Sequence, residues 1–281
     1  MEGRIVLKDG ELLAVPTVTL DVAAEAICFG HSLFETMLVR PYGEDGLFRL
    51  EAHLDRMLGS AKRLGWTLGP GVETLSAWVR LAASHFKSQR QGYGRLRLTA
   101  LWPRADQRPE TIVTIVPYDP PELPARVVTT DVRVPWTYVD GVPAPKSGSR
   151  VAYSFAERFA AQRGADEALL VDAGGSLAEG AKTNVFAVFG DTLATPAITS
   201  GILAGIARQT LIELARAAGV RVEERPVSRE EILNGGSLLL TNSLWGVRPA
   251  MELDGAPLPG VAGTARSLIE EYERAVRKAC T

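Results

Sequence analysis

The chain has 281 residues, of which 46% are hydrophobic and 23% charged, a balance typical of soluble globular proteins. Its net charge of −2 gives no indication of binding to nucleic acid or to an anionic membrane surface. No apolar run approaches the roughly 20 residues that span a bilayer, and at roughly 100–200 residues per domain we expect two domains.

The cysteines and histidines are not spaced like metal ligands. Cys28 and Cys280 lie near opposite ends of the sequence, and we expect them to remain reduced thiols in the cytoplasm. His31, His53 and His85 show no partner spacing, so the sequence predicts no metal site. The polar, alternating start of the chain is unlike a secretory signal peptide.

The N-terminal part alternates strands with amphipathic helices. RIVLKDG and ELLAVP predict a hairpin around Asp9 and Gly10, and FGHSLFETMLVR predicts a strand that returns, after a turn at 41–45, through LFRL. Apolar residues on one face predict a helix over EAHLDRMLGSAKRLG and a second over residues 73–88. GRLRLTALW and ETIVTIVPY then predict paired strands.

The densest proline in the chain lies in PYDPPELPAR, residues 117–126. Such a segment favours neither a helix nor a central strand. It predicts a linker over residues 119–126, between a smaller N-terminal α/β domain, 1–118, and a larger C-terminal α/β domain, 127–281.

The C-terminal part mixes strands and helices. VVTTDVRV, ALLVD, SLAEG, TNVFAVFG and SLLLTNSLWGVRP predict strands, and residues 151–163 and 263–279 predict helices. Another helix is expected from about Gly205, with Gly219 at its C-terminal cap, and Ser228 and Glu231 have capping-box spacing. This mixture predicts an α/β (α+β mixed) fold.

Two residues in this part have distinctive chemistry. Lys146 follows a Pro-rich approach and precedes a helix; a lysine becomes nucleophilic when its amine is desolvated or near positive charge. Glu179 ends a strand beside Gly180, where a carboxylate can hold the proton of a pyridine nitrogen. Taken singly, the Lys146 pattern is more typical of a surface lysine, and the Glu179 pattern is more typical of an exposed turn glutamate.

Three further positions have groups that bind phosphate. The SGILAGIARQT junction places the backbone N–H groups of Ile206 and Ala207 at a helix start. Asn242 and Ser243 end an apolar strand, and Arg56 lies off the apolar stripe of its helix. The alternatives are a plain turn for the SGILAGIARQT junction, a polar strand end for Asn242 and Ser243, and a solvated helix charge for Arg56.

The order of these motifs resembles the class IV, or fold-type IV, pyridoxal-phosphate enzymes, which include branched-chain and D-amino-acid aminotransferases and 4-amino-4-deoxychorismate lyase. The matching blocks are FGHSLFETM, HLDRM, PKSGSRVAYSFAERFAAQRGADEALLVD, LAEGAKTNVF, GILAGIARQTLIELA and LTNSLWGVRPA. The resemblance implies a two-domain fold with pyridoxal 5'-phosphate in the interdomain cleft. It also implies a small-molecule amino substrate and a homodimer whose partner chain helps to close the site.

The resemblance also implies roles for single residues. Lys146 matches the Schiff-base lysine, and Glu179 matches the acid at the pyridinium nitrogen. The matches to cofactor phosphate contacts are Arg56, Ile206, Ala207 and Asn242, with Ser243 beside the last. A scaffold protein without catalysis remains an alternative, against which the intact lysine and glutamate argue.

Individual positions favour the lyase within this family. Branched-chain aminotransferases usually have glycine where this chain has Thr36, and a cofactor-contacting tyrosine where it has Val151. Thr36 matches a threonine thought to assist proton handling, and Arg150 and Arg248 also resemble the lyase. We therefore expect 4-amino-4-deoxychorismate lyase, which eliminates pyruvate to give 4-aminobenzoate for folate. The alternative is an aminotransferase acting on branched-chain or D-amino acids with a 2-oxo acid acceptor.

One departure from the lyase pattern concerns substrate binding. The family often has an Arg-Gly pair where this chain has Trp102 and Pro103. Arg97, Arg104 and Arg248 remain as candidates for the residue that binds a substrate carboxylate.

Overall fold

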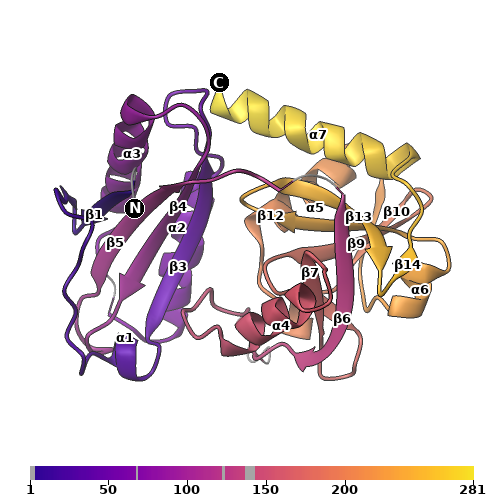
Figure 1. Cartoon of the computed structure of the whole chain (residues 1–281), viewed down its shortest axis with the longest axis horizontal. Helices are drawn as coiled ribbons and strands as arrows, with labels where there is room; N and C mark the ends of the chain where they lie inside the picture. The colour runs from indigo at the N-terminus through magenta and orange to yellow at the C-terminus, as the bar shows by residue number, and fades with distance from the viewer. Residues whose placement is uncertain (1–3, 68, 122–123, 137–142) are drawn as a thin grey trace. The chain divides into compact units, whose positions relative to one another are not determined.

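The computed structural model describes residues 4–67, 69–121, 124–136 and 143–281. The described residues divide into two compact units (Figure 1). The first comprises residues up to Pro120 together with Pro145–Ser149 and Val276–Thr281, and the second comprises Pro121–Ala144 and Arg150–Ala275. The mixed α/β class is as predicted.

The first unit is an antiparallel sheet packed against helices. Its strands lie in the order β2-β1-β5-β4-β3, so β3 forms one edge. The strands are β1 (Ile5–Lys8), β2 (Glu11–Leu12), β3 (Ser32–Val39), β4 (Gly94–Leu101) and β5 (Glu110–Pro117). The helices are α1 (Glu25–Cys28), α2 (Leu50–Arg63) and α3 (Val72–Gln89).

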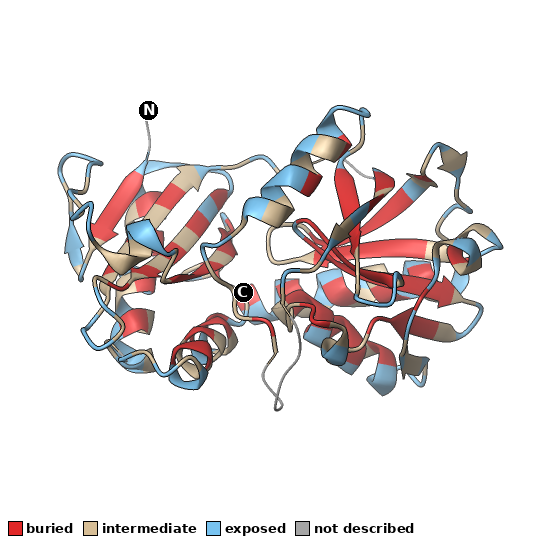
Figure 2. Ribbon diagram, turned by 90° about the horizontal axis from the view of Figure 1, so that it is seen from below, coloured by how far each residue is buried: buried red, intermediate tan, exposed pale blue. Residues whose placement is uncertain are grey.

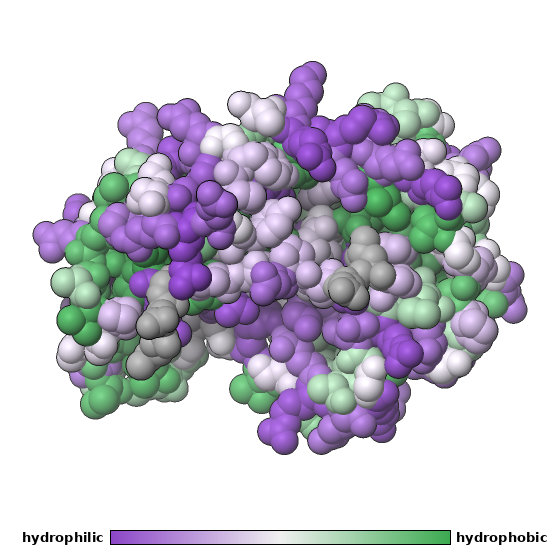
Figure 3. All heavy atoms as spheres, turned by 45° about the horizontal axis from the view of Figure 1, so that its top comes forward, coloured by the Kyte–Doolittle hydropathy of each residue, from purple (hydrophilic) through white to green (hydrophobic). Residues whose placement is uncertain are grey.

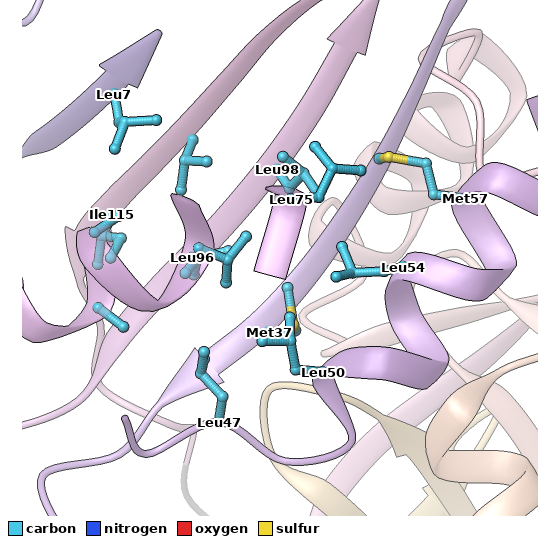
Figure 4. Close-up of a cluster of buried hydrophobic side chains, with 14 of the residues drawn as sticks. Leu7, Met37, Leu47, Leu50, Leu54, Met57, Leu75, Leu96, Leu98 and Ile115 are labelled. Carbon is cyan, nitrogen blue, oxygen red and sulfur yellow. The ribbon is translucent and has the colours of Figure 1, made fainter. Parts of the chain in front are cut away.

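Alternation along the strands gives this sheet two chemically different faces. Leu7, Met37, Leu96 and Ile115 point to the side covered by α2 and α3, where they form the core shown in Figure 4. Residues between them in the sequence face the other way. On β3 and β4 these include Phe34, paired with Thr99, and Thr36, paired with Arg97.

The expected hairpin at Asp9 and Gly10 is confirmed, with both residues at positive φ, 46° and 94°. The expected return strand over LFRL is wrong. Leu47 is buried in the core, Arg49 adopts a left-handed conformation (φ 54°), and α2 begins directly at Leu50. The apolar residues of this segment therefore anchor the start of a helix rather than a strand.

The second unit is built around a larger sheet in the order β11-β10-β9-β12-β13-β6-β7-β8. Because β8 also pairs with β9, the strands from β9 to β8 close into a ring. The strands are β6 (Ala125–Arg133), β7 (Glu167–Val171), β8 (Leu177–Gly180), β9 (Asn184–Phe189), β10 (Thr192–Thr195), β11 (Arg221–Glu224), β12 (Ser237–Asn242), β13 (Gly246–Leu253) and β14 (Ala256–Pro257), which pairs with β13.

Helices in the second unit bury one side against this sheet and expose the other (Figure 2). Helix α4 packs against the parallel pair β6 and β7, and α5 against β11 and β12. The N-cap of α6 is Ser228, whose hydroxyl accepts a hydrogen bond from the Glu231 N–H at 3.1 Å, while the Glu231 carboxylate accepts from Arg225. The helices are α4 (Val151–Ala161), the 3₁₀ turn η1 (Ile198–Ser200), α5 (Ile206–Ala217), α6 (Arg229–Leu233) and α7 (Gly263–Cys280), whose residues from Val276 onward cluster with the first unit.

The segment predicted as a linker, 119–126, includes residues 122 and 123, which lie outside the described residues. Its last two residues already belong to β6. The predicted boundary also assigned Lys146 to the C-terminal domain, whereas residues 145–149 cluster with the first unit because they pair with β3.

Hydrophilic side chains predominate on the face drawn in Figure 3, and the hydrophobic ones form separate patches. Among the described residues, none of the helices has the length and apolar character needed to cross a membrane.

Candidate functional site

Lys146 is fixed by backbone pairing along the edge of β3. The Phe34 N–H donates to the Lys146 carbonyl at 2.9 Å, Ser147 bridges to Leu33, and the Gly148 N–H donates to the Ser32 carbonyl at 2.9 Å. A Cβ atom on Gly148 would lie 2.1 Å from the Ser32 hydroxyl, so any larger residue there would displace that hydroxyl. The Pro- and Gly-rich approach is thus an extra edge segment of the sheet.

The Lys146 side chain shares an aromatic ring with an arginine. Its Nζ lies 4.9 Å from the Phe34 ring centroid, and the Arg97 guanidinium carbon lies 3.6 Å from the same centroid. Both are cation–π distances. A lysine close to another cation, on an apolar ring, is in the setting in which a lysine amine acts as a nucleophile.

The opposite face of β3 carries a buried charge cluster. Glu35 is completely buried, and its carboxylate accepts hydrogen bonds from Arg56 Nε at 2.9 Å and Arg56 Nη2 at 2.6 Å. His53 Nδ1 lies 2.6 Å from Glu35 Oε2; an ionised carboxylate only accepts, so this nitrogen carries the proton. Arg56, predicted to bind phosphate, is thus also a bidentate partner of Glu35.

Burial alone would raise the pKa of Glu35, but the Arg56 guanidinium and the His53 ring outweigh it and hold that pKa at about 2. Burial lowers the pKa of His53, against the pull of the Glu35 carboxylate. The cluster therefore consists of an ionised glutamate, an arginine and a neutral histidine at neutral pH.

This cluster predicts acid sensitivity of the fold. Because the folded pKa of Glu35 lies below its ordinary 4.5, its contribution is complete above pH 4.5 and is lost as the pH falls towards 2. The difference between these two pKa values of Glu35 corresponds to a free energy of about 3 kcal/mol. We expect the unfolding free energy of the cofactor-free protein, measured in urea at pH 7, 5 and 3, to fall accordingly. Glu35→Gln should flatten this dependence below pH 4.5, and an unchanged slope in that variant would contradict the assignment.

In the second unit, Glu179 lies in β8 and is 3% exposed. Its Oε1 accepts a hydrogen bond from the Tyr153 hydroxyl at 2.8 Å. Its Oε2 accepts from the Leu203 N–H at 2.9 Å and from Asn184 Nδ2 at 3.4 Å. Ala144, which precedes the Lys146 segment, forms a parallel bridge with Leu203. These donors fix a buried carboxylate and stabilise its charged form.

The expected helix start is confirmed: α5 begins at Ile206 with Gly205 as its N-cap, and no side chain caps it. A Cβ atom on Gly205 would lie 1.9 Å from Asn184 Oδ1, so the backbone approaches Asn184 closely. The first N–H groups of this helix, those of Ile206 and Ala207, have the geometry that attracts an anion.

The other predicted residues lie in different settings. Asn242 Oδ1 accepts from the Leu244 N–H at 2.9 Å and the Trp245 N–H at 3.1 Å, which stabilises the turn between β12 and β13 next to Ser243. Arg104 is exposed and pairs with Asp106. Arg248 is buried in the second unit, 3.4 Å from Asp166. Of the three candidate arginines, Arg97 is the one beside Lys146, opposite Thr36 in the β3–β4 register.

Sequence reasoning missed four residues of these clusters: Glu35, His53, Tyr153 and Asn184. Glu35 had a signal, because a glutamate at every-second-residue spacing from Leu33 and Met37 must face the core. A core-facing carboxylate requires a partner. Tyr153 and Asn184 had none, because only the fold brings them to Glu179.

The comparison with a family model and the comparisons with known proteins indicate the same family. The family model for amino-transferase class IV matches residues 32–253. The putative branched-chain-amino-acid aminotransferase of Methanocaldococcus jannaschii is 30% identical over 257 residues, covering 88% of this chain and 87% of that one. The bifunctional aminodeoxychorismate lyase / D-amino acid transaminase of Mycobacterium tuberculosis is 29% identical, covering 91% and 93%.

Solved structures share the fold along nearly the whole chain. The branched-chain aminotransferase of Thermoproteus uzoniensis with norvaline has a TM-score of 0.85 at 24% identity, covering 98% of this chain and 95% of that one. A hypothetical aminotransferase from Mycobacterium tuberculosis in its PLP-bound form has a TM-score of 0.83 at 25% identity, covering 98% and 99%. With its fold and most of its length matched, the chain belongs to the class IV aminotransferase family.

Proposed function

We propose that this protein is an aminotransferase that passes the amino group of a branched-chain or D-amino acid to a 2-oxo acid. Pyridoxal phosphate is its cofactor. The preferred expectation from single positions was the lyase. The relatives favour the alternative instead, since the Methanocaldococcus jannaschii and Pseudomonas aeruginosa proteins are both named branched-chain-amino-acid aminotransferases.

The residues present fit this cofactor. Glu179 is a buried carboxylate held by donors, as required of the partner of a protonated pyridine nitrogen. Lys146 supplies the amine that would hold the cofactor covalently. The start of α5 at Ile206 and Ala207 would bind its phosphate, together with Arg56, Asn242 and Ser243.

When bound, the cofactor supplies an electron sink for the carbon that bears the substrate amine. The chain's own contribution is the movement of a proton. The Lys146 amine would take the proton from that carbon and return it elsewhere during transfer. Thr36, on the same face of the sheet as Phe34, would place its hydroxyl where it assists this proton.

The observation that carries the amino-acid assignment is the pairing of Lys146 with Arg97 on the Phe34 ring. We propose that Arg97 binds a substrate carboxylate while Lys146 acts on the neighbouring carbon. Trp102, at the position of the lyase-like arginine, is 2% exposed and donates its ring N–H to the Thr67 carbonyl at 2.8 Å. It is a core residue and brings no cation to a substrate.

The test is a transamination assay on the holoenzyme. Branched-chain L-amino acids and D-amino acids are each supplied with 2-oxoglutarate or pyruvate, and the new 2-oxo acid is quantified. We expect turnover with at least one donor and a fall of on the order of 10²-fold or more in Arg97→Met, because a charge-assisted carboxylate contact is lost. Arg104→Met, at an exposed arginine, is the matched control and should be unchanged. No turnover with any donor would overturn the proposal.

The lyase remains the second candidate, favoured by Thr36 and Val151 and by the bifunctional relative from Mycobacterium tuberculosis. Supplying 4-amino-4-deoxychorismate and measuring 4-aminobenzoate distinguishes the two. Product from this substrate without any transamination would establish the lyase and exclude the aminotransferase. The homodimer and the cytoplasmic location implied by the resemblance stay predictions.

A further inference from the structure

We infer that Tyr153 is a positioning residue that sets the orientation and proton affinity of Glu179 toward the pyridine nitrogen of the cofactor. The inference rests on the proposed role of Glu179. It goes beyond that role because it assigns control of the carboxylate to a residue outside the predicted site. The carrying contact is the 2.8 Å hydrogen bond from the Tyr153 hydroxyl to Glu179 Oε1.

The two carboxylate oxygens of Glu179 have different partners. Oε2 accepts from the N–H of Leu203, in the loop before α5, and from Asn184, the first residue of β9. Oε1 accepts a hydrogen bond from Tyr153 of α4. Loss of the phenol would remove this hydrogen bond to Oε1 and leave the Leu203 and Asn184 contacts to Oε2 in place.

Tyr153 is itself held in place. The Arg150 guanidinium carbon lies 4.7 Å from the Tyr153 ring centroid. Arg150 Nη2 donates to the Ala181 carbonyl at 2.7 Å and to Glu157 at 3.3 Å. Ala181 directly follows β8, so Arg150 ties the start of α4 to the strand that carries Glu179. The phenol therefore reaches Glu179 from a fixed position.

The Tyr153 hydroxyl is protonated, and so a donor, at neutral pH. Burial raises its pKa, and the Glu179 carboxylate raises it further, while Arg150 opposes both. These two are the charged groups that act on Tyr153 among the described residues. The hydroxyl thus stays protonated and donates continuously to Oε1.

Tyr153 also lies close to Lys146 in the sequence. Helix α4 begins at Val151, immediately after the 145–149 segment that carries Lys146. The same short stretch therefore supplies the proposed covalent lysine and, in the first turn of α4, the phenol that bonds the proposed pyridinium partner.

The test uses ¹⁵N nuclear magnetic resonance of pyridoxal phosphate labelled at the ring nitrogen, bound to the holoenzyme and titrated with pH. A carboxylate with one donor fewer is a stronger base and retains the shared ring proton to higher pH. In Tyr153→Phe we expect the titration midpoint to rise by about one pH unit, and cofactor affinity to fall on the order of tenfold. Tyr93→Phe, at a partly exposed tyrosine, should leave both unchanged.

Glu179→Gln separates this inference from the proposed function. It should abolish the protonated ring signal; if it does not, the role of Glu179 fails. If Glu179→Gln alters the signal and Tyr153→Phe does not, the inference about Tyr153 is overturned and the proposed function stands. A purely structural Tyr153 would lower the thermal midpoint of the cofactor-free protein without moving the titration.

A second measurement covers failure of Tyr153→Phe to fold. Incorporating 3-fluorotyrosine makes the phenol more acidic and a stronger donor while the ring stays in place. The titration midpoint should then move down, opposite to the effect of losing the hydroxyl. A midpoint that does not move in the fluorinated protein would overturn the inference.

Discussion

Lys146→Ala should eliminate covalent attachment of pyridoxal phosphate and reduce amino-group transfer by on the order of 10⁴-fold. A positioned proton-transfer group alone contributes about 10²–10⁴-fold, and this variant loses the covalent link as well. The measurement is borohydride reduction of the holoenzyme, followed by peptide mass analysis and by steady-state rates. The wild-type label should fall on the peptide that contains Lys146.

Two lysines serve as controls. Lys62, an exposed residue of α2, and Lys182, an exposed residue between β8 and β9, should each be replaceable by alanine with the label on Lys146 retained. Retention of the label in Lys146→Ala, on either of these or elsewhere, would contradict the assignment. A variant without label but with full turnover would show that catalysis does not depend on this amine.

Local sequence patterns predicted most elements because their causes are local. The 3.6-residue period of α2 and α3, the turn residues Asp9 and Gly10, and the Ser228 cap each act within a few residues. The strand predicted over LFRL was wrong because that prediction, too, used only local patterns. The apolar residues of LFRL fit a strand or a helix start, and only packing of Leu47 and Leu50 into the core decides between them.

Pairings between distant segments could not be predicted from these patterns. Nothing local states that residues 145–149 pair with β3, which places Lys146 in the first unit. The partners of Glu179 come from α4, β9 and the loop before α5, three segments brought together by the fold. The motif order nevertheless identified the family, because a shared order of blocks reflects a shared fold.

Substrate class was the least predictable level. Thr36 and Val151 favoured the lyase, but each is a single side chain, and full-length relatives favoured the aminotransferase. The structure gives a physical reason why Trp102, which stands in place of the lyase-like arginine, counts against the lyase. A buried indole in contact with Trp66 is a packing residue, which supports the proposal that an arginine elsewhere binds the substrate carboxylate.

Arg56→Met should destabilise the cofactor-free protein by about 3–5 kcal/mol, because it leaves the completely buried Glu35 carboxylate without its cationic partner. The measurement is urea unfolding of the cofactor-free protein at pH 7. Arg274→Met is the matched control: it removes one partner of an exposed pair with Glu271 and should leave the unfolding midpoint unchanged. A stability loss no larger than that of the control would show that the Glu35 pair contributes nothing to the fold.

The same variant separates the two roles of Arg56. If Arg56 also binds the cofactor phosphate, Arg56→Met should weaken pyridoxal-phosphate binding on the order of tenfold, beyond its effect on folding. The double variant Glu35→Leu/Arg56→Met removes the buried charge together with its partner, and an apolar pair of similar volume often restores stability. Because the buried His53 also loses its Glu35 contact, we expect the double variant to recover part of the lost folding free energy but none of the lost cofactor affinity. Recovery of both would mean that Arg56 acts on the cofactor only by holding β3 against α2.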